Sequence, residues 1–154
     1  MDTDRFSVLL VDDDLVQIDL ARHVVSEICP EIELATVAGG DAVLHWFSAN
    51  ILNNKPLPHI ILMDLKLPKL DGLGVLRKLR SHTDTSEIPI VVFSAVYTQA
   101  DVLTSYKAGA NSFLAKPIDF AGYTELFRER LAYWKQPQQR GPIILAKGGA
   151  AGQV

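Results

Sequence analysis

Short apolar runs that each stop at a polar side chain recur along this chain. The clearest is 60–63, four consecutive apolar residues that lead directly into Asp64. An uninterrupted run of this length, followed by turn residues, is typical of a strand covered on both faces. In parallel sheets of this kind, ligands collect where the carboxyl ends of the strands emerge. We therefore expect Asp64 to stand at the ligand-binding edge of a sheet.

Three further segments share this pattern. They are 8–11 leading into Asp12, Asp13 and Asp14, 90–93 leading into Ser94, and 113–115 leading into Lys116. If the strands are parallel neighbours, these side chains converge in one crevice. A strand can also end in a polar residue merely because the chain is reaching the surface. One such end would carry no weight, but four ends with complementary chemistry favour a site.

The strands alternate with amphipathic helices, and 32–37 supplies one more strand. Alternation of this kind implies parallel pairing through right-handed crossovers, with helices on both faces of the sheet. The fold class is therefore α/β, a doubly wound five-stranded parallel sheet. We expect the flavodoxin-like strand order 2-1-3-4-5, which brings the ends of the first and third strands together at the switch point.

Three helices carry specific expectations. In the third helix, after Asp71-Gly72, the basic residues Arg77, Lys78 and Arg80 are expected on the side opposite the apolar leucines. The last helix is expected to bury one apolar stripe, made of Phe120, Tyr123, Phe127, Leu131 and Trp134. Between these two helices, Thr98 with Asp101 indicates a capping box at the start of a further helix, which Gly109 is expected to end.

Composition excludes several classes of function. With 154 residues, of which 48% are hydrophobic, the chain fits one globular domain with a substantial core. A net charge of -3 provides no basic field for nucleic acid. The N-terminus lacks the features of a signal peptide, and no apolar run is long enough to span a bilayer, so we expect a cytoplasmic protein. Cys29 is a lone cysteine and is expected to be a small structural hydrophobe, with a redox role as the alternative.

The polar strand ends resemble a known family. Asp12-Asp13, the lone Asp64 followed by Pro68 and Asp71-Gly72, Ser94-Ala95, and Lys116-Pro117 are similar to the receiver domain of bacterial two-component response regulators. The resemblance covers roughly residues 5–133, and its motifs occur in the right order.

The clustered carboxylates repel one another, so a cation is expected, and hard oxygen ligands suit Mg²⁺. The resemblance implies that Asp13, Asp64 and the backbone carbonyl of Lys66 bind the metal directly, and that Asp12 acts mainly through a metal-bound water. Asp14 is expected to point away into solvent.

The resemblance also implies that Asp64 is the phosphoacceptor. It would attack a phosphoryl group in line, while Mg²⁺, the Lys116 ammonium and the Ser94 hydroxyl meet the charge on the equatorial oxygens. Phe113, three residues before Lys116, stands where the family often has Tyr. It is either an aromatic switch that responds to Ser94 or fixed core packing.

By this resemblance the phosphoryl group comes from a histidine kinase, and the chain is a substrate more than an enzyme. A stand-alone regulator would signal in trans, through a downstream protein or a phosphotransfer protein. The run 109–117 with Tyr133-Trp134 is similar to single-domain regulators paired with bacterial phytochrome kinases, which would make the ultimate input light.

Two alternatives remain. A Mg²⁺-dependent phosphohydrolase of the haloacid dehalogenase kind would also use a strand-end Asp64 as nucleophile. That family, however, places an acid or base two residues later, where this chain has Lys66. A scaffold that only binds partners would be expected to lack Asp64 or Lys116, and both are present.

The expected domain boundaries are 5–135 for the receiver and 136–154 for a C-terminal extension. Tyr133 and Trp134 are adjacent, so they cannot both join the buried stripe, and one aromatic is left outward. The extension contains a short apolar patch at 143–145, followed by a Gly- and Ala-rich segment at 147–154 that is expected to be disordered. A two-fold partner could bury these groups, so we expect a homodimer through the last helix, while a frayed end without a role is the alternative.

Overall fold

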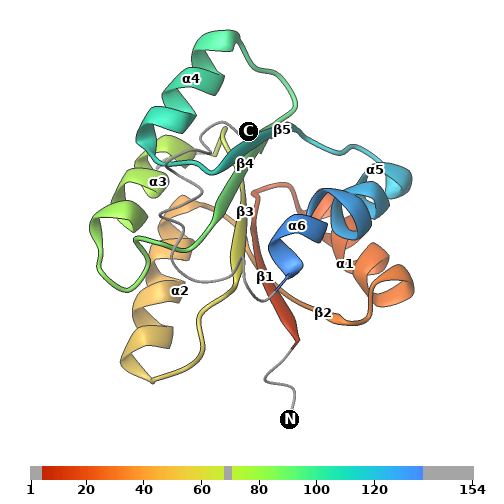
Figure 1. The fold of residues 1–154 in the computed structure, drawn as a ribbon, viewed down its shortest axis with the longest axis horizontal. Helices are drawn as coiled ribbons and strands as arrows, with labels where there is room; N and C mark the ends of the chain where they lie inside the picture. Colours follow the sequence, from red (N-terminus) through yellow and green to blue (C-terminus); the bar gives the residue numbers. More distant parts are fainter. Residues whose placement is uncertain (1–4, 68–70, 137–154) are drawn as a thin grey trace.

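The computed structural model describes residues 5–67 and 71–136. Within this part of the chain, one parallel sheet contains β1 (Phe6–Val11), β2 (Ile32–Val37), β3 (Ile60–Asp64), β4 (Ile90–Ser94) and β5 (Ser112–Ala115). The strand order is β2-β1-β3-β4-β5 (Figure 1). The predicted flavodoxin-like order is therefore confirmed. Of the expected extension 136–154, residues 137–154 with the apolar patch lie outside the described residues, as does Pro68.

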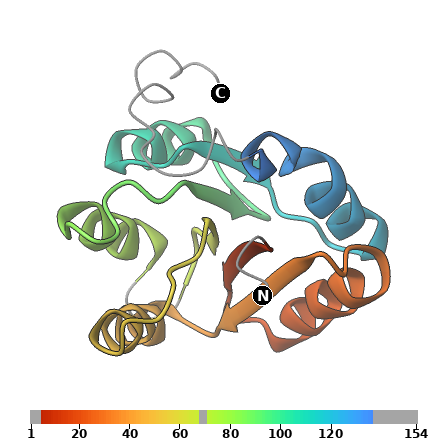
Figure 2. The ribbon, with the colours of Figure 1, turned by 60° about the horizontal axis from the view of Figure 1, so that its bottom comes forward.

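Helices cover both faces of the sheet. They are α1 (Leu15–Ile28), α2 (Gly40–Leu52), α3 (Gly72–Ser81), α4 (Gln99–Ala108), α5 (Phe120–Glu125), a π-helical turn (Leu126–Arg130) and α6 (Ala132–Lys135). Figures 1 and 2 show α1, α5 and α6 on one side of the sheet and α2, α3 and α4 on the other. Among the described residues, no helix is both long and apolar enough to cross a membrane.

The sheet divides the apolar core into two layers because successive strand residues point to opposite faces. In β1, Val8 and Leu10 pack in the layer beneath α1 and α5, whereas Leu9 and Val11 pack in the layer beneath α2 and α3. Every residue of β3 and β4 is buried. The predicted strand covered on both faces is confirmed, and this rigid centre carries Asp64 and Ser94 at its edge.

The helix signals near α4 are confirmed. Thr98 Oγ1 accepts from the Asp101 amide at 3.1 Å, and Asp101 Oδ2 accepts from the Thr98 amide at 2.9 Å, which completes the capping box. At the other end of α4, Gly109 has a φ of 115°, a left-handed conformation that glycine adopts without strain.

The last helix differs from its expected regular stripe. Tyr123, Phe127 and Leu131 are buried, but Phe120 is 37% exposed, so its inclusion in the stripe was wrong. The π-helical turn closes with the Leu131 amide donating to the Leu126 carbonyl at 3.0 Å, and this turn shifts the register of the residues that follow. Of the adjacent aromatic pair, Tyr133 is the outward member and is 51% exposed, whereas Trp134 packs partly against the core.

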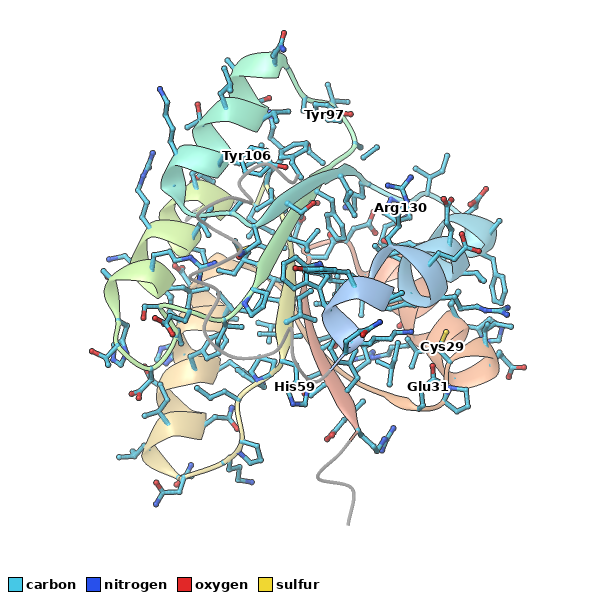
Figure 3. The ribbon with its side chains drawn as sticks, in the orientation of Figure 1. Cys29, Glu31, His59, Tyr97, Tyr106 and Arg130 are labelled. Atoms are coloured by element: carbon cyan, nitrogen blue, oxygen red, sulfur yellow. The ribbon has the colours of Figure 1, made fainter. Side chains whose placement is uncertain are left out.

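Cys29 is buried beside the end of α1, close to Glu31 (Figure 3). Burial raises the pKa of the thiol, and the nearby Glu31 charge adds to this effect. Its burial fits the expected role of a small structural hydrophobe.

The sequence pattern predicted Arg80 on the solvent side of α3, together with Arg77 and Lys78. This prediction was wrong, because the Arg80 side chain turns inward. Its guanidinium donates to the Gly109 carbonyl at 2.9 Å, to the Asn111 side chain at 2.8 Å, and to three carbonyls of the loop before β4 at 2.8 to 3.3 Å. The same Asn111 oxygen accepts from the Ile90 amide at 2.9 Å. Burial lowers the pKa of Arg80 to about 10. This side chain therefore ties α3 to the starts of β4 and β5.

We predict that Arg80→Lys lowers the free energy of unfolding by about 2 kcal/mol, because a single ammonium cannot replace the planar fork and leaves buried carbonyls without donors. Urea denaturation measures this change. Arg77→Lys is the matched control, because Arg77 is an exposed residue of the same helix. Equal stability of the two variants would contradict a structural role for the Arg80 network.

Candidate functional site

The predicted site residues meet at the edge of the sheet where the strands end. Asp12 follows β1, Asp64 closes β3, Ser94 closes β4 and Lys116 follows β5. The backbone continues to pair beyond the strands, since the Asp12 amide donates to the Val37 carbonyl at 3.1 Å and the Lys116 amide to the Ser94 carbonyl at 3.0 Å. These bonds hold the side chains in place, so the expected convergence occurs.

Lys116 bridges two carboxylates in this site. Its Nζ lies 2.6 Å from Asp64 Oδ2 and 2.9 Å from Asp12 Oδ2, and the three side chains are 10%, 8% and 0% exposed, respectively. Burial lowers the pKa of Lys116, but its bonds to Asp64 and Asp12 outweigh this and raise the pKa overall. Burial raises the pKa of Asp12, and the Asp14 amide and Lys116 offset only part of that effect. The ammonium thus compensates charge that burial would otherwise disfavour.

The carboxylates exceed the ammonium in number. Asp12, Asp13 and Asp64 each offer an oxygen, and these oxygens lie within 4.8 Å of one another. Asp13 is exposed, whereas Asp12 Oδ2 is buried and has no hydrogen-bond donor of suitable geometry, although Lys116 is close enough for an ion pair. Three carboxylates of this kind, open to solvent on the Asp13 side, fit a hard divalent cation.

Local backbone structure shapes the acidic turn after β1. The Asp14 amide donates to Asp12 Oδ1 at 3.0 Å, which directs the other Asp12 oxygen towards Lys116. Asp14 is exposed as expected, but it also begins α1, because its carboxylate accepts from the amides of Val16 and Gln17 at 3.0 and 3.4 Å. The sequence interpretation missed this capping role, although Asp before an amphipathic helix is its usual signal.

The Asp71-Gly72 pair has a clear physical function. Asp71 Oδ1 accepts from the Gly74 amide at 3.0 Å and begins α3. A Cβ on Gly72 would lie 2.7 Å from the Asp64 carbonyl oxygen and 2.8 Å from the Leu65 Cα, so no larger residue fits there without displacing the backbone. Glycine therefore allows α3 to start directly against the end of β3. On the other side, Asp64 Oδ1 accepts from the Lys66 amide at 2.9 Å.

Ser94 and Phe113 both contact the loop that follows β4. Ser94 is fully buried, and its hydroxyl donates to the Val96 carbonyl at 2.9 Å, in the loop that leads to α4. Phe113 is half-buried and packs edge-on against Tyr97, with ring centroids 4.9 Å apart. Figure 3 shows Tyr97 in the same loop. Both predicted switch residues therefore contact the segment between β4 and α4.

The sequence interpretation missed a polar contact between α5 and α1, close to the acidic turn after β1. The buried Tyr123 of α5 donates its hydroxyl hydrogen to Gln17 Oε1 of α1 at 2.8 Å. Burial raises the pKa of Tyr123, and the charges of Asp12, Asp64 and Asp14 raise it further, so the phenol stays protonated. No short-range pattern pairs residues so far apart, and the bond fixes α1 against α5 on the side of the acidic turn.

Comparison with known proteins agrees with this geometry. Residues 8–128 match the response regulator receiver domain family. The response regulator Rcp1 of Synechocystis sp. is 29% identical over 82% of this chain and 87% of its own length. The response regulator PleD of Caulobacter vibrioides is 35% identical over 65% of this chain, but the match covers only 23% of PleD.

Solved structures give the same result. The phosphorylated cyanobacterial phytochrome response regulator RcpA superposes with a TM-score of 0.74 at 26% identity, covering 84% of this chain and 94% of RcpA. The Mn²⁺-bound form of Rcp1 gives a TM-score of 0.72 at 28% identity, covering 85% and 95%. These relatives are response regulators, which favours the receiver over the phosphohydrolase interpretation. The chain belongs to the response regulator receiver domain family.

Proposed function

We propose that Asp64 accepts a phosphoryl group from a histidine kinase and that the chain then signals in trans through a change in conformation. The observation that carries this proposal is the position of the Asp64 carboxylate, which lies at the end of a buried strand beside Asp12, Asp13 and the Lys116 ammonium. Asp64 thus supplies a nucleophile. Lys116 and a cation held by the acidic residues would supply the positive charge that a phosphoryl group requires.

The transfer begins when an oxygen of Asp64 attacks the phosphorus of a phosphohistidine. The new O–P bond forms as the N–P bond breaks, and the electron pair of that bond returns to the imidazole nitrogen. The ring leaves as neutral imidazole when its second nitrogen carries a proton. Lys116 already contacts Asp64, so it is placed to meet the negative charge of the transferred group.

Mg²⁺ is the cation that we assign to the acidic cluster. Asp13, Asp64 and the Lys66 carbonyl would hold it directly, with Asp12 acting through water. The metal would neutralise the carboxylates and bind phosphoryl oxygens. The Mn²⁺ in the Rcp1 structure supports a divalent ion in a related protein.

Ser94 and Phe113 are the groups to which we assign the response. Ser94 has a single hydroxyl hydrogen, so it must leave the Val96 carbonyl in order to donate to a phosphoryl oxygen. Phe113 contacts the same loop through Tyr97, so a displaced loop would free its ring to change rotamer.

A bacterial phytochrome kinase is the input that we assign. The structure of the bacteriophytochrome response regulator AtBRR is 28% identical to this chain with a TM-score of 0.63, covering 79% of this chain and 89% of AtBRR, and RcpA is likewise a phytochrome response regulator. The downstream partner would be another protein or a phosphotransfer protein.

We also propose a homodimer through the last helix. The support is Tyr133, a large aromatic side chain that is 51% exposed at the end of the described chain. Further along the chain, segment 143–145 is apolar in sequence. A second copy would remove both from water.

We predict that Asp64→Asn abolishes labelling by acetyl phosphate and by a cognate kinase, because the amide is a very poor nucleophile. The change is nearly isosteric, so circular dichroism should show an unchanged fold. Asp41→Asn, an exposed acid in the first turn of α2, is the matched control and should label normally. Labelling of the Asp64→Asn variant at the wild-type level would refute the assignment.

We predict that Asp12→Asn raises the free energy of unfolding by about 1 kcal/mol in chelator, because it removes a buried charge that lies beside Asp64. The same variant should lose most of the stabilisation that Mg²⁺ gives the wild type, since the ion binds only the folded cluster. Thermal unfolding with and without Mg²⁺ measures both effects. A variant that keeps the full Mg²⁺-dependent shift in Tm would contradict this cation site.

We predict that light scattering detects a dimer for the full chain and a monomer for a truncation after Lys135 that also carries Tyr133→Ser. Both proteins should be measured with and without beryllofluoride, a phosphoryl mimic. A Lys78→Ser variant, which alters an exposed residue of α3, serves as a surface control. If every sample is monomeric at high protein concentration, the dimer proposal fails.

A further inference from the structure

The N-terminus of α4 is connected to the phosphoacceptor region by two separate contacts. The first is the hydrogen bond from the Ser94 hydroxyl to the Val96 carbonyl, at 2.9 Å. Val96 lies only two residues before Thr98, which caps α4. This contact must break if Ser94 turns towards a phosphoryl oxygen, because the hydroxyl has one hydrogen to donate.

The second contact passes through Lys66. Its backbone amide donates to Asp64 Oδ1 at 2.9 Å, and its side-chain ammonium lies 3.6 Å from Asp101 Oδ2 in the first turn of α4. That same Asp101 oxygen accepts from the Thr98 amide at 2.9 Å. One carboxylate oxygen therefore joins the cap of α4 to the residue whose amide contacts the phosphoacceptor.

Helix α4 has few other contacts that would resist displacement. Its only fully buried residue is Ser105, whose hydroxyl has no hydrogen-bond partner among the described residues. Leu103 in the middle of α4 is 57% exposed. By contrast, α3 buries Val75, Leu76 and Leu79 along its inner face. Elements with so little buried apolar surface open most easily, so small contacts at the end of α4 affect its position.

We propose that the Lys66–Asp101 ion pair is a latch that holds α4 in its unphosphorylated position and opposes the response to phosphorylation. This inference rests on the proposed function of Asp64. Occupation of the site draws the Ser94 hydroxyl from Val96 and removes the first contact, and the latch is the contact that remains. The ion pair thus stabilises the unmodified conformation and sets how readily the modified one forms.

The size of the effect follows from exposure. The Lys66 and Asp101 side chains are 59% and 28% exposed, so the ion pair is partly screened by water. Because water weakens such a pair, we expect its loss to change an equilibrium constant by roughly two- to fivefold at most. We expect the latch to adjust the response within this range without abolishing it.

Beryllofluoride affinity tests the latch in the full chain with Mg²⁺ present. The informative variants are Lys66→Met, Asp101→Asn and the double variant, measured by isothermal titration calorimetry. Lys66→Met keeps the backbone amide and carbonyl that face Asp64. Asp101→Asn keeps an oxygen that can accept from the Thr98 amide, so the capping bond can persist while the ion pair is lost.

The two single variants separate the latch from simple electrostatics. Beryllofluoride is an anion, so loss of a positive charge alone would weaken its binding, and loss of a negative charge alone would strengthen it. The latch instead predicts that both variants bind about two- to fivefold more tightly, and that the double variant gains no more than either single variant. Lys107→Met is the matched control, because Lys107 is an exposed lysine of α4, the helix that contains Asp101.

A second measurement follows α4 itself. Amide hydrogen exchange in α4 of the unmodified protein should be about two- to fivefold faster in Lys66→Met than in the wild type, and unchanged in Lys107→Met. Opposite shifts in affinity for the two single variants, additive effects in the double variant, or unchanged exchange would each overturn the latch. A wild-type protein that binds no beryllofluoride would instead refute the proposed function, and the latch with it.

Discussion

The arrangement of the site depends on the contact between the Lys116 ammonium and the carboxylates of Asp12 and Asp64. These charges are almost completely removed from water, and each would be strongly disfavoured alone. They are stable together only because the ends of β1, β3 and β5 are held at one edge of a rigid sheet. Even so, the carboxylates exceed the ammonium, so the site retains a demand for positive charge. That imbalance gives the edge of the sheet an affinity for a divalent cation, while an all-apolar edge would be more stable but inert.

Helix α3 connects this charged edge to the opposite edge of the sheet, where β4 and β5 start. It begins against Asp64 at Gly72, where a side chain would collide with the backbone of β3. Near its other end, Arg80 binds the segments that precede β4 and β5. Since Ser94 ends β4 and Lys116 follows β5, a helix that is fixed at both ends helps to hold Asp64, Ser94 and Lys116 in register. A buried guanidinium suits this task because several carbonyls can share its donors.

The two halves of the molecule are not packed equally. Strands β1, β3 and β4 are almost wholly buried, whereas β5 has no fully buried residue and α4 has only one. Asp64 and its acidic neighbours therefore lie on the rigid side, where the geometry that the proposed phosphoryl transfer needs is preserved. Ser94, Phe113 and the α4 cap face the looser side, where small changes in hydrogen bonding and charge can shift an equilibrium. This distribution suits a domain that must first bind a group accurately and then respond to it.

Much of this could be predicted from the sequence alone. Apolar runs that end at Asp12, Asp64, Ser94 and Lys116 determined the parallel sheet and the side chains at its edge, because strand periodicity and chain alternation are local properties. Only the tertiary structure decided that Arg80 turns inward, that a π-helical turn leaves Tyr133 outward, and that Lys66 meets Asp101. The physical reason is that these features depend on distances between elements remote in the chain, where exposure and ion pairing are set by packing. A short sequence window contains the residues but not their neighbours.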